Sequence, residues 1–217
     1  MSDTSSVVTA EHFRYVADRT TQEDDFLRSL KQAATAAGIP SIWIAPEQAS
    51  FMQILLKLRG ARRVVEVGTL AGYSAINLAR ALPPDGRLTT IELDETRAEF
   101  AAAWIARSDV ADRIEVRRGD AARILPSLAD ASADAVFLDA NKTGYALYLQ
   151  QARRLLRPSG LIMVDNAFAF GALFAKGPQE GEVEAVRSFN EVMARAPGFH
   201  SVIVPIGDGL WVGAREP

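Results

Sequence analysis

The stretch 62-RRVVEVGTLAGYSAINLARAL-82 decides the fold class of this 217-residue chain. Its first part, RRVVEVG, is a short apolar run that ends at a glycine, which is typical of a buried strand. From about Gly72 to Ala81 the pattern becomes that of an amphipathic helix. A strand followed at once by a helix is the first half of a parallel crossover unit. We therefore expect a parallel sheet if the unit repeats along the chain.

The unit does repeat toward the C-terminus. The further predicted strands are RLTTIEL, RIEVRRG, DAVFLDA and GLIMVDN, and the helices between them cover about 95–107, a short stretch after the third strand, and about 145–156. A helix from Val183 to Ala194 precedes FHSVIVPIGDGLWVGARE, which predicts two strands joined by a turn at Gly207-Asp208-Gly209. The pattern predicts an α/β fold with a doubly wound sheet of seven strands, mostly parallel with an antiparallel strand in the C-terminal hairpin.

The residues before this region predict helices. Residues from about 10 to 37 are alanine-rich with interspersed charges, and Gly38-Ile39-Pro40 is a stop signal. A second helix is predicted from Pro46 to Gly60, and its apolar face is expected to consist of Phe51, Ile54, Leu55 and Leu58. We expect one domain over residues 1–217, with a helical extension at 1–60 and an α/β core at 61–217.

The composition is that of an ordinary globular protein, with 48% apolar and 24% charged residues. A net charge of -3 gives no reason to expect a nucleic-acid partner or an anionic membrane. The absence of cysteine excludes disulfides, a thiolate nucleophile and cysteine metal sites. No signal-peptide pattern and no apolar run near about 20 residues is found, so a cytoplasmic protein is expected.

Acidic residues mark the expected binding edge of the sheet. In an open parallel sheet, ligands bind outside the carboxyl ends of the strands. Each predicted parallel strand ends on or beside a carboxylate, and these are Glu66, Glu92, Asp120, Asp139 and Asp165. Random polar turns would not usually give this regularity, so the sequence predicts a functional site at this edge.

The turn after the first strand indicates the kind of ligand. Gly68 and Gly72 permit a tight turn and close approach of a ligand. The G-x-G-x-x-G turn that binds dinucleotide phosphates is absent, and Glu66 is expected to repel phosphate. Glu92 ends the second strand, where a carboxylate can accept hydrogen bonds from ribose hydroxyls. A cationic or zwitterionic ligand with a ribose fits better than NAD, which disfavours an NAD-dependent oxidoreductase.

The fourth and fifth strands end in oxygen donors. Asp139, Asp165 and Asn166 suit a hard divalent ion, Mg²⁺ first and Mn²⁺ or Ca²⁺ as alternatives. Beside such a cation, Lys142 would favour its neutral form, which a general base requires. The alternative is that Asp139 caps an ordinary turn, that Asp165 and Asn166 form another, and that Lys142 is solvated.

Several segments together resemble a known family. VVEVGTLAGYSAINLARAL, TTIELD, VFLDANKTGYALYL and LIMVDNAFAFG are similar to the class I S-adenosylmethionine-dependent O-methyltransferases, in particular the cation-dependent branch that includes catechol and caffeoyl-CoA O-methyltransferases. The resemblance extends from about Pro46 to the C-terminal hairpin. It implies a Rossmann-like fold, S-adenosyl-L-methionine as methyl donor, a divalent cation and a hydroxyl acceptor.

The resemblance also implies residue roles. The methionine part of the cofactor would contact Glu66, Gly68, Thr69 and Ser74, the ribose Glu92, and the adenine Ala121, with Ile44, Asp139 and Asn141 as further cofactor-binding positions. Asp139, Asp165 and Asn166 would bind the metal, and Lys142 would be the catalytic base beside Asp139.

Two departures from the family pattern bear on cofactor and substrate. The family more often has D-A-D-K where this chain has D-A-N-K, so Asn141 removes a charge near the cofactor. The usual large aromatic residue with small neighbours is replaced by Ala167-Phe168-Ala169-Phe170. Phe168 and Phe170 are predicted to form an apolar wall for a flat substrate.

The sequence leaves the acceptor open. The leading hypothesis is a small, catechol-like aromatic hydroxyl. Hydroxyuridine in transfer RNA and carrier-bound biosynthetic intermediates are alternatives, of which the acidic composition disfavours RNA. A nucleotide-binding domain without chemistry has no need of the complete set of Asp139, Lys142, Asp165 and Asn166. We expect a homodimer, with residues 10–37 covering the site or forming the dimer face.

Overall fold

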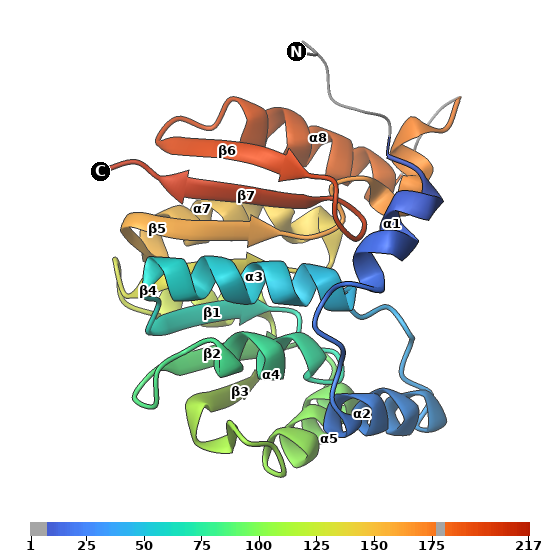
Figure 1. Cartoon of the computed structure of the whole chain (residues 1–217). Helices are drawn as coiled ribbons and strands as arrows, with labels where there is room; N and C mark the ends of the chain where they lie inside the picture. The colour runs from blue at the N-terminus through green and yellow to red at the C-terminus, as the bar shows by residue number, and fades with distance from the viewer. Residues whose placement is uncertain (1–7, 177–180) are drawn as a thin grey trace.

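A computed structural model describes residues 8–176 and 181–217 (Figure 1). One seven-stranded sheet has the strand order β3-β2-β1-β4-β5-β7-β6. The strands are β1 (Arg63–Val67), β2 (Arg87–Glu92), β3 (Ile114–Arg118), β4 (Ala133–Leu138), β5 (Leu156–Val164), β6 (Phe199–Val204) and β7 (Leu210–Arg215). The strands β1 to β5 pair in parallel, whereas β7 is antiparallel to both β5 and β6. The predicted α/β fold, with its antiparallel hairpin strand, is confirmed.

The sheet reverses its winding between β1 and β4. From β1 the chain adds β2 and β3 on one side, and from β4 it adds β5 on the other. Parallel strands require right-handed crossovers, so this reversal opens a crevice at the carboxyl ends of β1 and β4. These ends lie at the right of the sheet in Figure 1.

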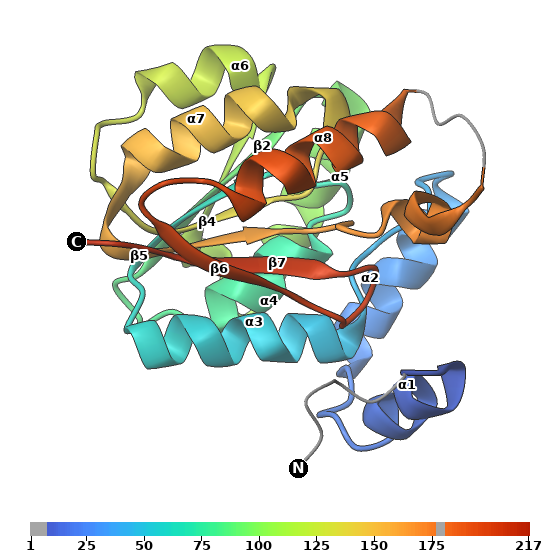
Figure 2. The same ribbon diagram turned by 90° about the horizontal axis from the view of Figure 1, so that it is seen from above.

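Helices cover both faces of the sheet (Figure 2). Those on one face are α3 (Pro46–Arg59), α4 (Tyr73–Arg80) and α5 (Glu95–Ile105), and those on the other are α6 (Ala121–Ile124), α7 (Tyr145–Leu155) and α8 (Glu182–Ala194). The short 3-10 helices are η1 (Ala111–Arg113), η2 (Leu125–Ser127), η3 (Lys142–Gly144) and η4 (Ala169–Phe174). Because side chains alternate along a strand, Val64 packs under the first group and Val65 under the second.

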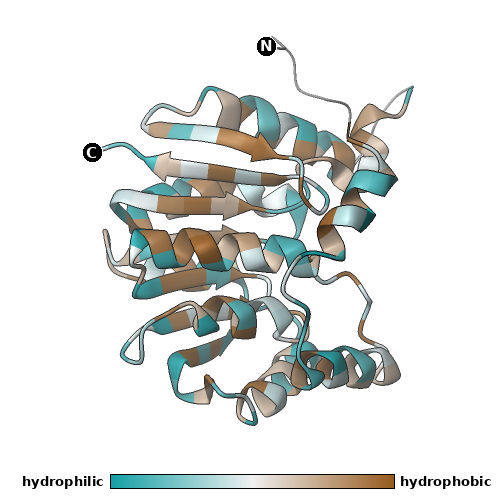
Figure 3. Ribbon diagram, viewed as in Figure 1, coloured by the Kyte–Doolittle hydropathy of each residue, from teal (hydrophilic) through white to brown (hydrophobic). Residues whose placement is uncertain are grey.

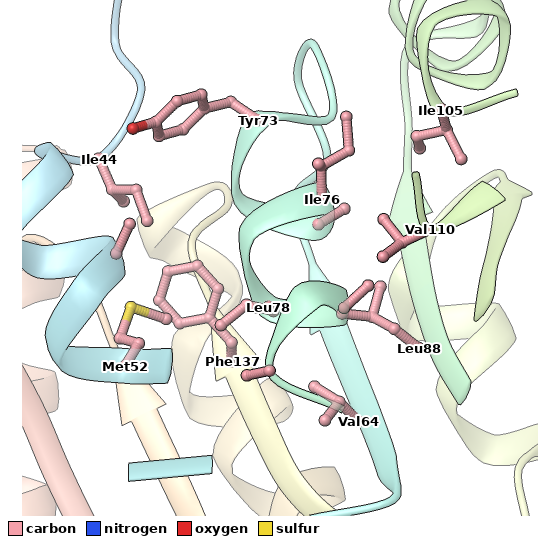
Figure 4. Packing of buried hydrophobic residues seen from close by; sticks show 14 of the residues in the cluster. Ile44, Met52, Val64, Tyr73, Ile76, Leu78, Leu88, Ile105, Val110 and Phe137 are labelled. Carbon is pink, nitrogen blue, oxygen red and sulfur yellow. The ribbon is translucent and has the colours of Figure 1, made fainter. Parts of the chain in front are cut away.

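The core on the α3 side joins the helices to the sheet. Met52 of α3, Leu78 of α4 and Phe137 of β4 are fully buried and point toward one another (Figure 4). Burial of each such side chain stabilises the fold by about 1.5–3 kcal/mol. Leu27 and Leu30 of α2 (Asp25–Ala36) belong to the same cluster. Helix α2 is therefore packed into the core that supports the sheet.

The helix predicted over residues 10–37 is divided in two. The structure has α1 (Ala10–Ala17) and α2, with residues 18–24 between them. The Asp24 side chain accepts a hydrogen bond from Leu27 N (2.9 Å), and its extended backbone begins α2 as an N-cap. Helix α1 buries no side chain, and Figure 2 shows it at the outer edge of the molecule, beyond α3. Within residues 8–176 and 181–217, no helix is long and apolar enough to cross a membrane.

Helix α3 begins and ends where the sequence predicts, but its buried face is different. Ile54 and Leu58 are 54% and 81% exposed. The buried residues are Gln48, Ala49, Met52 and Leu56. These positions also recur at helical spacing, so the sequence contained two possible stripes, one of them with a polar residue. Of the predicted stripe, Phe51 and Leu55 are partly buried against the core, whereas Ile54 and Leu58 lie on the outside of α3, a helix that carries apolar segments in Figure 3.

Candidate active site

The residues that follow the parallel strands are aligned by backbone hydrogen bonds. Asp139 N donates to Val67 O (2.9 Å), and Asp165 N donates to Leu138 O (3.0 Å). The ladder thus continues one step beyond the last paired residues of β1, β4 and β5. As a result, Asp139 and Asp165 lie side by side at one edge of the sheet.

A cavity of about 650 Å³ opens at this edge, a volume typical of small-molecule sites. The predicted cofactor residues Ile44, Gly68, Thr69, Ser74, Glu92, Ala121, Asp139 and Asn141 all line it. Lys142 and Asn166 line the same cavity. The positions predicted for the cofactor and those predicted for catalysis therefore meet in one space.

Glu66 lies behind the cavity rather than in its wall. It is 0% exposed, and neither carboxylate oxygen has a hydrogen-bond partner of normal geometry among the described residues. Burial raises the pKa of Glu66 to about 8, although the nearby hydroxyls of Ser74 and Thr90 lower it in part. Glu66 is thus largely protonated at neutral pH. The protonated form carries no charge to repel phosphate, so the repulsion expected from Glu66 stays a prediction for its ionised form.

Glu92 shapes the turn after β1. Its Oε2 accepts hydrogen bonds from Thr69 N (3.1 Å) and Leu70 N (2.8 Å), and its Oε1 accepts from Asp94 N (3.0 Å). Leu70 has φ 52°, a left-handed conformation that these bonds hold in place. A carboxylate has about four acceptor positions, so capacity remains for a ligand hydroxyl.

Lys142 joins the ends of β4 and β5. Its Nζ donates hydrogen bonds to Asp139 Oδ1 (3.2 Å), Tyr145 Oη (2.8 Å) and Asn166 Oδ1. The residue is only 8% exposed. The alternative of a solvated lysine in an ordinary turn is therefore wrong. One cationic nitrogen is surrounded by oxygen atoms from two strand ends and from α7.

Asp165, together with Asp139 and Asn166, forms a group of oxygen donors that is called the oxygen cluster. Its Oδ1 accepts a hydrogen bond from Gln48 Nε2 (2.8 Å). Burial raises the pKa of Asp165 to about 7, and the charge of Asp139 adds to the effect. Burial also raises the pKa of Asp139, while Lys142 opposes the increase. Both shifts arise first from burial, which disfavours the charged form of each carboxyl group.

The oxygen cluster fits a hard cation. Asp139 and Asn166 already direct oxygen atoms at one cationic atom, Lys142 Nζ, and Asp165 adds a second carboxylate. Two carboxylates and an amide oxygen match the donors that Mg²⁺ and Ca²⁺ prefer. Among the described residues, no group of three or more His, Cys, Asp or Glu could hold a metal ion. Such a site here therefore depends on the amide of Asn166.

Sequence reasoning missed Gln48, Tyr145 and Asp208. Gln48 and Asp208 contact the cluster from α3 and from the turn between β6 and β7, since Asn166 Nδ2 donates to Asp208 Oδ2 (3.2 Å). Nothing in the local pattern of either segment indicates these contacts. Tyr145 lies three residues after Lys142 in a helical segment, so this neighbour was open to prediction.

The two departures from the family pattern have separate structural effects. Asn141 is exposed, and its Oδ1 accepts hydrogen bonds from Thr143 N (3.0 Å) and Thr143 Oγ1 (2.8 Å), so it caps the turn that contains Lys142. Phe170 lines the cavity and is 67% exposed. Phe168 instead packs against Phe174, with ring centroids 5.6 Å apart. The predicted apolar wall therefore consists of Phe170 without Phe168.

Comparison with known proteins agrees with this geometry. Residues 17–216 match the O-methyltransferase family, and the chain belongs to that family. A catechol O-methyltransferase of Niastella koreensis is 37% identical over 205 residues, which are 93% of this chain and 90% of the relative. The resemblance seen in the sequence and the prediction of an O-methyltransferase are confirmed.

Solved structures give the same result. The O-methyltransferase TomG of Streptomyces achromogenes, involved in tomaymycin synthesis and solved with S-adenosylmethionine, is 35% identical with a TM-score of 0.84, and the match covers 95% of this chain and 96% of TomG. An O-methyltransferase of Bacillus cereus, solved with S-adenosylhomocysteine, is 32% identical with a TM-score of 0.85, over 94% and 96% of the two chains.

Proposed function

We propose that this chain transfers a methyl group from S-adenosylmethionine to a hydroxyl of a small, catechol-like acceptor, with a divalent cation, Mg²⁺ first. The observation that supports this most is that one cavity is lined both by the turn after β1 and by Lys142 and Asn166. The relatives solved with S-adenosylmethionine or S-adenosylhomocysteine support the cofactor. The catechol O-methyltransferase of N. koreensis supports the acceptor class.

Each part of the site has an assigned role in this proposal. The turn from Gly68 and the carboxylate of Glu92 hold the cofactor, while Asp139, Asp165 and Asn166 hold the cation. When bound, the sulfonium supplies the methyl group, and the cation favours the deprotonated form of a neighbouring hydroxyl.

Side chains of the protein remove the proton of the acceptor hydroxyl and position the acceptor ring. Lys142 Nζ, in its neutral form, takes the proton of the acceptor hydroxyl. Trp43 and Phe170 line the cavity and hold a flat ring so that its oxygen faces the methyl group in line. Such positioning supplies much of the rate of a methyl transfer.

The charge of the cavity supports a small acceptor without phosphates. Among the described residues that line it, the basic ones are Arg97 and Lys142. The acidic ones are Glu92, Asp94, Asp120, Asp139 and Glu182. A phosphate-bearing acceptor, such as transfer RNA or a carrier-bound intermediate, would find little positive charge here. A neutral or cationic catechol fits better.

A homodimer is part of the proposal. Ile54 and Leu58 are exposed apolar residues on α3, and Phe51 and Leu55 beside them are only partly buried. Contiguous apolar surface of this kind is typical of protein interfaces. Light scattering should give twice the monomer mass, and Leu58→Glu should shift it toward the monomer. A monomeric wild type would refute this part of the proposal.

One assay tests the activity, the metal and the acceptor together. The protein is incubated with labelled S-adenosylmethionine and either a catechol panel or unfractionated RNA, with EDTA or with added Mg²⁺. We expect methylation of catechols that EDTA abolishes and Mg²⁺ restores. Equal rates with EDTA and Mg²⁺ would refute metal dependence, and labelling of RNA alone would favour the transfer RNA alternative. The absence of S-adenosylhomocysteine binding by calorimetry would refute the cofactor.

A further inference from the structure

The turn between β6 and β7 contacts the segment that follows β5. Asp208 Oδ2 accepts hydrogen bonds from Asn166 Nδ2 (3.2 Å) and from Phe170 N (2.7 Å). The backbone of the same turn adds a further bond, from Phe168 N to Asp208 O (3.0 Å). A single carboxylate therefore holds both the amide of Asn166 and the loop that presents Phe170 to the cavity.

The carboxylate of Asp208 and the Nζ of Lys142 together determine which end of the Asn166 amide faces Lys142. An asparagine side chain has one accepting atom and one donating group, and a carboxylate only accepts. Asn166 must therefore turn its Nδ2 toward Asp208, which leaves Oδ1 on the side of Lys142 Nζ. Only Oδ1 can bind a cation, so the rotation of this amide is decisive for metal binding.

Gln48 supports the neighbouring carboxylate in the same way. It is buried, and its Nε2 donates to Asp165 Oδ1 (2.8 Å). It also packs on the turn that contains Asp208, because a Cβ atom at Gly207 would lie 1.9 Å from Gln48 Oε1. Helix α3 and the turn between β6 and β7 thus form one supporting layer behind Asp165 and Asn166.

We infer that Asp208 is a positioning residue, which fixes the Asn166 amide with Oδ1 toward the divalent cation, and that Gln48 fixes the Asp165 carboxylate from the other side. The inference rests on the proposed function, because the cation toward which the Asn166 amide is oriented is part of that proposal. Removal of such outer partners typically weakens metal binding by about 10- to 100-fold.

Asp208→Asn tests the inference with little change in volume. Asparagine can donate as well as accept, so Asp208→Asn no longer compels Asn166 Nδ2 to face this side, and only the hydrogen bond from Lys142 Nζ to Asn166 Oδ1 still opposes rotation of the amide. Mn²⁺ affinity of the S-adenosylhomocysteine-bound protein, measured by electron paramagnetic resonance, should fall by about 10- to 100-fold. S-adenosylhomocysteine affinity and Tm should change little. Asp112→Asn, at an exposed aspartate of η1, is the matched control and should leave Mn²⁺ affinity unchanged.

A second measurement does not require metal. The side-chain amide signals of Asn166 are assigned in ¹⁵N spectra by their loss in Asn166→Ser. In Asp208→Asn these signals should shift and exchange faster with water, whereas Asp112→Asn should leave them in place. Wild-type Mn²⁺ affinity and amide signals that both persist in Asp208→Asn would overturn the inference. A wild type that binds no Mn²⁺ would refute the proposed metal role and this inference with it, whereas a failure of the inference alone leaves wild-type Mn²⁺ binding intact.

Discussion

The backbone oxygen of Asp139 lies against the Cα of Gly68, so closely that a Cβ atom on Gly68 would be 1.8 Å from it. The contact joins the ends of β1 and β4, where the winding of the sheet reverses. Gly68 also has φ 97°, a conformation that other residues rarely adopt. Glycine is therefore required here twice, once for its backbone and once for the space.

Gly68→Ala should destroy cofactor binding. The backbone oxygen of Asp139 must move away from the new Cβ, which displaces the end of β4 and the oxygen cluster beside it. Gly60→Ala is the matched control, because Gly60 also has a positive φ (65°) but has no atom within 4 Å of an added Cβ. The control should lose about 1–2 kcal/mol of unfolding free energy, and Gly68→Ala clearly more. Urea denaturation and calorimetry with S-adenosylhomocysteine measure both effects, and equal losses in the two variants would contradict the steric explanation.

The sequence predicts the fold well because its signals are local. Pro46 and Gly60 bound α3, and alternating strands and helices predict a parallel sheet with carboxylates at one edge. Asp24, a typical N-cap residue, is a local signal for the start of α2, but the predicted helix extended across it. The buried face of α3 was not predictable from its pattern alone, because two stripes at the same spacing compete and only the packing against β4 selects one.

The contacts of Gln48 and Asp208 with the site could not be predicted from local sequence patterns. Gln48 contacts a residue 117 positions away, and Asp208 contacts one 42 positions away. Both pairs depend on the final arrangement of α3 and the β6–β7 turn around the sheet edge. Strand-end residues are predictable since every parallel strand ends at the same edge, whereas residues that approach that edge from other segments are not.

Glu66→Gln should change how stability depends on pH. The folded-state pKa of Glu66 is raised to about 8 from 4.5, so between these pH values the folded protein holds a proton that the unfolded chain has lost. Wild-type unfolding free energy should therefore fall relative to Glu66→Gln as pH rises from 5 to 8, by at most about 1.4 kcal/mol per pH unit, and level off above 8. Urea denaturation of both proteins across this range measures the difference. Parallel pH profiles would show that Glu66 does not titrate in this way.

Lys142→Met should separate catalysis from cofactor binding. Methionine keeps much of the length of the side chain but cannot take a proton, so kcat should fall on the order of 10²- to 10⁴-fold. S-adenosylhomocysteine affinity should remain near that of the wild type, since the cofactor's predicted partners are at the turn after β1. Lys57→Met, at an exposed lysine of α3, is the control for loss of a positive charge. An unchanged kcat in Lys142→Met would remove this lysine from the reaction.

Glu182→Gln should alter the preference for charged acceptors. Glu182 lies in the first turn of α8, lines the cavity, and acts electrostatically on Tyr145 beside Lys142. With the negative charge removed, kcat/KM should fall about two- to fivefold for a catechol with an aminoethyl group, which is the effect expected from the loss of an exposed charge pair. For a catechol with a carboxylate, kcat/KM should rise. Glu184→Gln, two residues further along the same helix and paired with Arg187 (3.8 Å), should leave both values unchanged. Added salt should reduce the wild-type preference. If Glu182→Gln treats the two acceptors as the wild type does, its carboxylate does not face the acceptor, and the charge preference must come from Asp139 and its neighbours.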